Sequence, residues 1–585
     1  MLIYNLHFVL LILIVPIFRS CSAIPRRGLE PWSIILCKFR DLATYEPRTK
    51  NWFVRWITGH NDEPDTIEQY FMNVSNGLYS IGGSNVNGWF TLSKTQKDIL
   101  RMVGKSRRGR INPPLLGSDS SFRYFDVIKD LCFAEAVKNG SSLHRQKITI
   151  INAGTAAVFD KKNGVLLTPQ LVFSSVLTHE MVHSFFIGHS YSDRKIRVFP
   201  YASSGEYDDR YDLMSTANAY MYHSNFGMSG PGLNGPHLDY LGWLPMDRML
   251  YFGRESGNNY TLRLSSISVP HNQTRGWLLI MLPYDRDDPN NYYTIELRTP
   301  HNFDRGIAQA KYEILDIYTT NLAFCSDEGT EWVTFLELMS PTTSDSITNK
   351  GKQNSSSRNF QFIRVSLKKV YEYDADIHII STFNPTECHF GEQKFYSSRQ
   401  SHPFLVGLDH ICLGATMSKN YNSTADNNEF IAERSKRDEQ LRLVRLFNGG
   451  DFKKQFGRQN FFSNRKTFGA NSCRKGFVWR SLDSYDYVCV TEQRQKLAQR
   501  ENLLQENRIS YNGHAIRCIE PFLPRRAFPD DEICVLAEEK FHIFRENSQA
   551  CFYQKILHIN FLFRHIARCF MLISLMGLIQ SVHNH

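Results

Sequence analysis

Two histidines with a carboxylate beside the first are the residues of this sequence best arranged for chemistry. The stretch from 178 to 190 reads THEMVHSFFIGHS and places His179 and His183 four residues apart. Side chains four residues apart lie on one face of an α-helix, so both imidazoles can converge on one metal ion. Glu180 can reach a water on that metal. The pattern predicts a hydrolytic site in which Glu180 is the general base.

The His-Glu-x-x-His motif also arises by chance, and histidines packed or solvated on an ordinary helix are the alternative. Two further features strengthen the prediction: His189 lies ten residues after His179, and residues 211–215 read YDLMS. With the later stretch GPGLNGPHLDYLGWLP, these features resemble the metzincin peptidases, and among them the gametolysin (autolysin) group. The resemblance covers roughly residues 30–250 and is sharpest at 171–245.

This resemblance implies both a set of roles and an activity. His179, His183 and His189 would hold one catalytic zinc ion, Glu180 would be the catalytic base, and Met214 would form the Met-turn beneath the metal. The implied protein is a secreted zinc endopeptidase that hydrolyses peptide bonds of protein or glycoprotein substrates, in the extracellular matrix or at cell surfaces. The alternative is a catalytically silent relative that acts as an extracellular binding or adhesion protein.

One position departs from the metzincin pattern. Metzincins carry Gly seven residues after the first histidine, where the chain turns back, and here that residue is Phe186. The turn needs a backbone conformation that costs a bulky residue about 1–2 kcal/mol. Three outcomes are open: Gly188 provides the turn, Phe186 is strained, or the third ligand is misplaced. The last outcome would favour the silent relative.

Several features predict export. The apolar run of residues 8–18 and the small residues after it predict a signal peptide over residues 1–23, with a buried or membrane helix as the alternative. The chain has 12 cysteines, and an oxidising route implies disulfides. Six sequons predict N-glycosylation at Asn73, Asn139, Asn259, Asn272, Asn354 and Asn422.

The pattern of apolar and polar residues changes twice along the chain. Residues 24–250 mix helical and strand patterns and predict an α+β catalytic domain with a twisted sheet and the zinc-binding helix. Its expected strands are 33–39, short strands separated by Gly and Asn turns within 77–91, and 147–152. Its expected helices are 92–103 and 125–137. Residues 251–385 alternate apolar and polar positions and predict an antiparallel, sandwich-like β-domain. Its expected strands are 260–269, 276–282, 292–297 and 362–370.

Cysteine spacing dominates residues 386–550. Cys473–Cys489 and Cys518–Cys534 enclose loops of equal length, and neighbouring positions also match, such as Arg480 with Arg525. This is an internal repeat of about 45 residues, each unit a Cys-closed loop followed by a charged helix. Cys388 and Cys412 form a looser candidate copy. We also expect a Cys37–Cys132 disulfide, with Cys37 as an inhibitory zinc ligand as the alternative.

Charge and the C-terminal tail limit the partners. The net charge of +10 is a mild excess over 585 residues, and the sequence contains no nucleic-acid-binding motif, so we expect no nucleic-acid partner. The tail, 551–585, is apolar but interrupted by basic residues. We expect an ordinary helix there, with a membrane or lipid anchor as the alternative. The sequence does not determine the oligomeric state.

Overall fold

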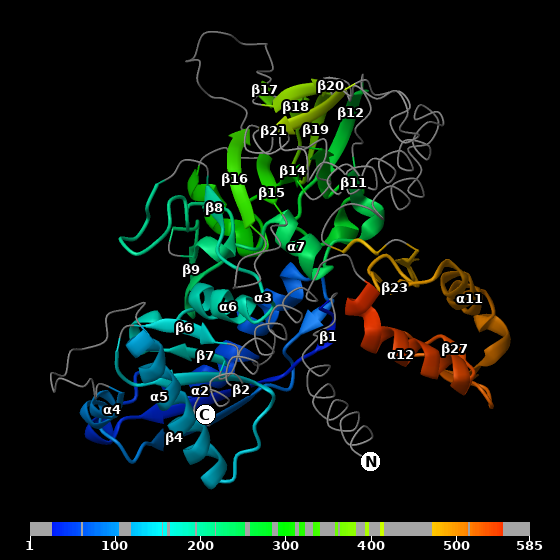
Figure 1. Cartoon of the computed structure of the whole chain (residues 1–585). Helices are drawn as coiled ribbons and strands as arrows, with labels where there is room; N and C mark the ends of the chain where they lie inside the picture. The colour runs from blue at the N-terminus through cyan, green and yellow to red at the C-terminus, as the bar shows by residue number, and fades with distance from the viewer. Residues whose placement is uncertain are drawn as a thin grey trace, which may run out of the picture. The chain divides into compact units, whose positions relative to one another are not determined.

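The structure, a computed structural model, describes residues 26–59, 63–103, 119–154, 156–160, 164–192, 196–216, 218–251, 258–283, 291–310, 315–321, 332–339, 357–360, 363–381, 392–396, 410–414, 471–474, 476–512 and 515–553. They form a mixed α+β protein with several small sheets (Figure 1). The chain divides into two compact units. The larger unit comprises residues 28–238 and 243–464, and the smaller unit comprises 1–27, 239–242 and 465–585.

A five-stranded sheet lies at the centre of the first half of the larger unit. Its order is β4 (Asn85–Thr91), β2 (Trp32–Lys38), β5 (Gln146–Ile151), β7 (Gly164–Leu167) and β6 (Ala157–Asp160). The first four strands are parallel, whereas β6 pairs antiparallel at the edge. Because β2 is apolar at nearly every position, both of its faces can be buried. The strands predicted near 33–39 and 147–152 are confirmed.

Helices cover this sheet. The predicted helices are present as α4 (Gln96–Val103) and α5 (Asp119–Lys138), and α5 contacts β2, β4 and β5. Cys37 and Cys132 are fully buried in the core between α5 and the sheet, at disulfide distance, with Cα atoms 6.1 Å apart. Two short helices, α2 (Lys50–Ile57) and α3 (Ile67–Val74), were not predicted. The metal-motif helix, α6 (Ser174–His183), contacts β6 and β7.

Two further sheets occupy the second half of the larger unit. One has the order β11 (Met249–Tyr251), β13 (Leu279–Pro283), β14 (Asn291–Leu297), β15 (Leu315–Asn321), β16 (Trp332–Met339) and β8 (Tyr191–Ser192). The other has the order β12 (Asn258–Ser265), β19 (Asp374–Ser381), β18 (Ile363–Val370) and β17 (Ser357–Phe360). One hydrophobic cluster joins them, with Ile280 and Ile295 from the first sheet and Leu264 and Ile377 from the second. The predicted strands at 260–269, 276–282, 292–297 and 362–370 therefore lie in a two-sheet arrangement.

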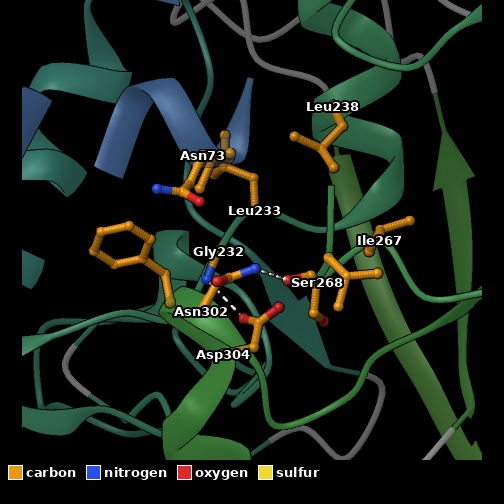
Figure 2. Close-up of a pocket in the computed structure, with 11 residues that line it drawn as sticks. Asn73, Gly232, Leu233, Leu238, Ile267, Ser268, Asn302 and Asp304 are labelled. Carbon is orange, nitrogen blue, oxygen red and sulfur yellow. Dashed lines mark hydrogen bonds between the residues drawn. The ribbon is translucent and has the colours of Figure 1, made fainter. Parts of the chain in front are cut away.

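The two halves of the larger unit contact each other at several places, and two of these contacts involve segments close to the metal motif. Strand β8 comes directly after the metal motif in sequence, yet it pairs in parallel with β16 of the six-stranded sheet. The backbone of residues 230–235 also lies beside Asn302 and Asp304 of η7 (Asn302–Ala310), where a small pocket forms (Figure 2). Residues on both sides of 250, the expected domain boundary, belong to the same compact unit.

The smaller unit contains the two predicted repeats. In the first, β22 (Val478–Trp479) pairs with β23 (Cys489–Val490) and α11 (Glu492–Leu503) follows. In the second, β26 (Leu523–Pro524) pairs with β27 (Cys534–Val535) and α12 (Ala537–Tyr553) follows. Each loop is closed by its cysteines at disulfide distance, with Cα atoms 5.6 and 5.5 Å apart. Equivalent buried ion pairs stabilise both loops, Arg480–Asp486 and Arg525–Asp531.

The remaining sequence predictions concern the surface and the ends. Of the predicted glycosylation sites, Asn73, Asn139, Asn259 and Asn272 are exposed, whereas Asn354 and Asn422 lie outside the described residues. Cys412 lies in β21 (His410–Gly414), and Cys388 lies outside the described part. The predicted signal peptide, 1–23, and most of the tail, from 554 onward, also lie outside it. Within the described residues, no helix has the length and apolar character needed to cross a membrane.

Candidate metal centre

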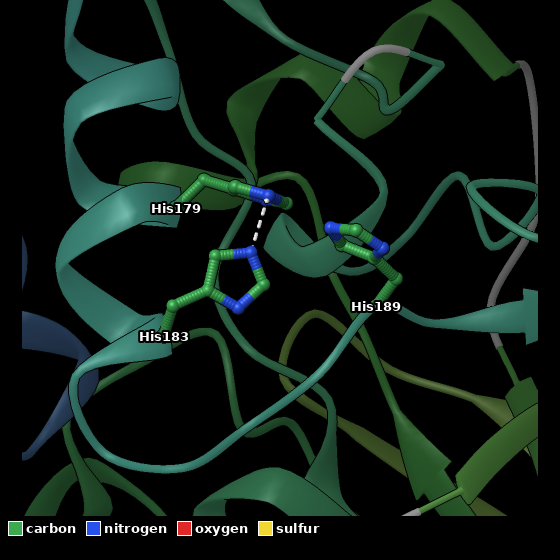
Figure 3. Close-up of side chains that lie close together, drawn as sticks. All are labelled: His179, His183 and His189. Atoms are coloured by element: carbon green, nitrogen blue, oxygen red, sulfur yellow. Dashed lines mark hydrogen bonds between the residues drawn. The ribbon is translucent and has the colours of Figure 1, made fainter. Parts of the chain in front are cut away.

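Three histidine side chains converge at the C-terminal end of α6. His179 and His183 project from successive turns of the helix, and His189 returns from the loop that follows (Figure 3). Their ligand atoms all lie within 4.8 Å of one another, and the Nε2 atoms of His179 and His183 are 3.1 Å apart. Nitrogens about 2.0–2.1 Å from one tetrahedral ion lie about 3.3 Å apart, so this spacing suits a shared metal.

The second nitrogen of each ring faces an oxygen acceptor. His179 Nδ1 lies 3.1 Å from the carbonyl oxygen of Leu213, and His183 Nδ1 lies 2.8 Å from that of Ile187. His189 Nδ1 lies 2.6 Å from Oε1 of Glu206. Carbonyl and carboxylate oxygens accept but do not donate, so each Nδ1 carries the proton. This arrangement fixes the ring orientation and leaves the Nε2 lone pairs for a metal.

The donor set itself fits a cation. With both protons on Nδ1, the Nε2 lone pairs of His179 and His183 face each other and cannot bond to one another. Burial and the neighbouring histidines hold the pKa of His179 well below its usual range and lower the pKa of His183 to about 3, so both rings are neutral. A positive ion between them would accept both lone pairs. The three residues can therefore hold a metal ion.

Glu180 lies on α6 beside the first ligand and is buried, with 8% of its surface exposed. Burial raises the pKa of its carboxyl group to about 8, against the opposing effects of the Phe159 backbone N–H and the charge of Lys129. Phe159 belongs to the edge strand β6, and its ring stacks on that of His183 with centroids 6.4 Å apart. Glu180, His179 and His183 are thus placed by α6, with β6 packed beside them.

Met214 lies in a short turn, η4 (Leu213–Ser215), and is fully buried. Asp212 precedes this turn, and its carboxylate accepts hydrogen bonds from the Met214 backbone N–H at 3.0 Å and from the Ser190 hydroxyl at 2.5 Å. The turn carries the Leu213 carbonyl that orients His179, so Asp212 supports a ligand through the backbone.

The turn between the second and third histidines answers the question raised by Phe186. Phe186 has φ +65°, the left-handed conformation that usually requires glycine. The chain therefore turns at the expected position with a bulky residue, at a cost of about 1–2 kcal/mol. His189 still lies with the other two histidines. Of the three outcomes left open by the sequence, strain at Phe186 is the one observed.

Two polar residues next to the third ligand were not identified from the sequence. Glu206 orients His189, and the hydroxyl of Tyr207 lies 3.0 Å from His189 Nε2. They follow the third histidine by 17 and 18 residues, so no helical or strand periodicity connects them to it. A carboxylate seventeen residues from a histidine is not a signal that a sequence pattern can isolate.

Other histidines near the Met-turn do not join the cluster. His237 is fully buried with its Nδ1 3.2 Å from Asp212, and His223 is exposed on β9 (Tyr222–Ser224). Within the described part of the chain, His179, His183 and His189 form the single group suited to a metal ion. Compared with known proteins, the sequence matches no protein-family model and no curated protein.

Proposed function

We propose that this protein is a secreted, zinc-dependent endopeptidase of the metzincin type, similar to the gametolysin group. The observation that carries the proposal is the convergence of His179, His183 and His189 with every Nδ1 held by an oxygen acceptor. Three histidine ligands with an open fourth position are a ligand set typical of catalytic zinc. When bound, zinc supplies a Lewis acid for the scissile carbonyl and makes water more acidic.

The chain's own residues have distinct tasks in this mechanism. Glu180 accepts the proton of the attacking water and delivers it to the leaving amine, which completes hydrolysis of the peptide bond. Its raised pKa, about 8 without a metal, reflects its apolar surroundings, and a nearby cation favours the charged, basic form. Met214 provides an apolar floor, and Glu206 keeps the third ligand in its tautomer.

Secretion is supported by separate observations. Three cysteine pairs lie at disulfide distance, and four sequon asparagines are exposed. Protein or glycoprotein substrates in a matrix or at a cell surface suit such a protein. The geometry of Phe186 and His189 takes away the specific reason for favouring a silent binding protein, namely a displaced third ligand.

The test is zinc content together with peptidase activity, on the purified secreted protein and on Glu180→Ala. We expect one zinc per chain in both proteins, with activity in the wild type alone. A His183→Ala variant serves as the control that loses the metal. Stoichiometric zinc without activity, even after limited proteolysis, would favour the silent binding protein, and no zinc in the wild type would refute the metal site.

A further inference from the structure

The Met-turn is paired with a second backbone segment, residues 230–235. The Leu213 N–H donates to the Gly232 carbonyl at 3.0 Å, and the Leu213 carbonyl faces His179 Nδ1 at 3.1 Å. The Asn234 N–H donates to Asp212 at 2.7 Å. The position of residues 230–235 therefore determines the position of the carbonyl that orients the first histidine.

Charged side chains from the second half of the larger unit, here called the β-rich half, form hydrogen bonds to the other side of residues 230–235. The Gly232 N–H donates to Asp304 Oδ1 at 2.8 Å (Figure 2). Arg298 Nη1 donates to the Leu233 carbonyl at 3.0 Å, and the Gly235 N–H donates to Glu296. Glu296 lies in β14, Arg298 directly follows that strand, and Asp304 lies in η7.

These three side chains also bind one another. Arg298 donates from Nε to Asp304 Oδ2 at 3.1 Å and from Nη2 to Oδ1 at 2.5 Å, and it donates to Glu296 at 3.3 Å. Exposure of the side chains is 1% for Arg298, 5% for Asp304 and 0% for Glu296. Buried charges that lose a partner are strongly penalised, so the cluster permits essentially one arrangement of the segment.

We propose that Glu296, Arg298 and Asp304 are positioning residues of the metal centre. A continuous series of hydrogen bonds runs from Asp304 through Gly232 and Leu213 to His179, so the β-rich half orients a metal ligand from outside the catalytic motif. The inference rests on the metal site of the proposed function, and it is independent of which bond the enzyme cleaves. If these three residues only filled the space between the two halves of the larger unit, replacing them would lower stability and leave metal affinity unchanged.

The experiment measures zinc affinity of the full-length secreted protein by chelator competition, together with the visible spectrum of the Co²⁺-loaded form and the unfolding midpoint. The variants are Asp304→Ala, which removes the acceptor of the Gly232 N–H, and Asp304→Asn, which can retain it. Two controls come from the same half of the unit. Asp376→Ala breaks the more exposed Arg263–Asp376 pair, and Ile379→Val lowers stability from within the hydrophobic cluster.

We expect Asp304→Ala to weaken zinc binding about tenfold and to change the Co²⁺ spectrum, because lost outer partners of metal ligands typically cost 10–100-fold in affinity. Asp304→Asn should recover most of the loss, and both controls should bind zinc like the wild type. If folded Asp304→Ala has the zinc affinity and Co²⁺ spectrum of the wild type, this inference is overturned and the proposed function is not. If Asp304→Ala does not fold, Asp304→Ser replaces it, because the shorter side chain also withdraws the acceptor from the Gly232 N–H. Wild-type zinc affinity and Co²⁺ spectrum in folded Asp304→Ser would then overturn the inference. Failure of the wild type to bind zinc would overturn the proposed function as well.

Discussion

Glu206 Oε1 lies 2.6 Å from His189 Nδ1, so a carboxylate orients the third ligand while backbone carbonyls orient the other two. The hydrogen bond to His189 lowers the pKa of Glu206, which keeps it charged. We expect Glu206→Ala to weaken zinc binding by 10–100-fold, the usual effect of losing such a partner. Glu206→Gln keeps an acceptor and should lose less.

Chelator competition measures this effect. Glu46→Ala, which removes a carboxylate from an ion pair with Lys38, is the matched control and should leave zinc affinity unchanged. Equal affinities for wild type and Glu206→Ala would show that the ring of His189 is oriented by other contacts.

At position 186 we expect a glycine variant to be more stable than an alanine variant, which reverses the usual order of the two residues in a helix. Phe186→Gly and Phe186→Ala both remove the half-buried ring and differ by one Cβ atom. At φ +65° the glycine variant should be more stable by about 1 kcal/mol, whereas in an ordinary helix alanine is favoured by about 0.5–1 kcal/mol. Urea unfolding of the two variants measures the difference. Greater stability of the alanine variant would place residue 186 in a right-handed conformation.

The repeat cysteines should contribute to stability by closing short loops. Each pair is separated by 16 positions in the sequence, and closing a loop of about 15 residues is worth about 3 kcal/mol in the chain-entropy account. We expect the double variant Cys473→Ser/Cys489→Ser to lower the free energy of unfolding of the smaller unit by about that amount. The equivalent change at Cys518 and Cys534 is the matched comparison.

Thiol alkylation followed by mass measurement checks the same point directly. The wild type, without reductant, should leave all four repeat cysteines unlabelled. Rapid labelling of any of them before unfolding would contradict the pairing.

His271 should make stability depend on pH. It is buried, and burial together with the charge of Arg248 lowers its pKa to about 3, from an ordinary value near 6.5. Between these values the unfolded chain binds a proton that the folded chain does not. Stability should therefore fall as the pH falls from 6.5 towards 3, by up to about 1.4 kcal/mol per pH unit from this residue.

The measurement compares urea unfolding of wild type and His271→Gln at several pH values. The variant should lose less stability than the wild type below pH 6.5, and the two should have parallel curves above it. Parallel curves across the whole range would mean that His271 is not buried in its neutral form.

The sequence predicts the metal ligands better than their supports. His179 and His183 follow from helical periodicity, because positions four apart share a face whatever the surrounding fold. His189 follows only from the resemblance, since ten residues that include a turn have no fixed geometry. The partners of the second ring nitrogens, such as Glu206 and the Leu213 carbonyl, are brought in by tertiary structure and leave no periodic trace.

Helices and strands are likewise predictable from the sequence where a periodic pattern extends over many residues. Continuous apolar strands such as β2 and long helices such as α5 are predicted because their periodicity extends over many residues. The short helix α2 was missed, although Thr49 accepts a hydrogen bond from the Trp52 N–H and so provides a recognisable N-cap. The two-residue strand β8 carries no periodic signal, and its pairing with β16 depends on residues about 140 positions away.

Strand β8 has a practical consequence for anyone who wishes to express a shortened form of this protein. It lies immediately after the third ligand, and its neighbour β16 ends at residue 339, far beyond the motif-bearing region. A fragment that stops near residue 250 would leave the loop between His189 and Glu206 without the strand beside it. The shortest fragment with an intact centre should therefore extend through β19, to about residue 381, so that both later sheets are complete.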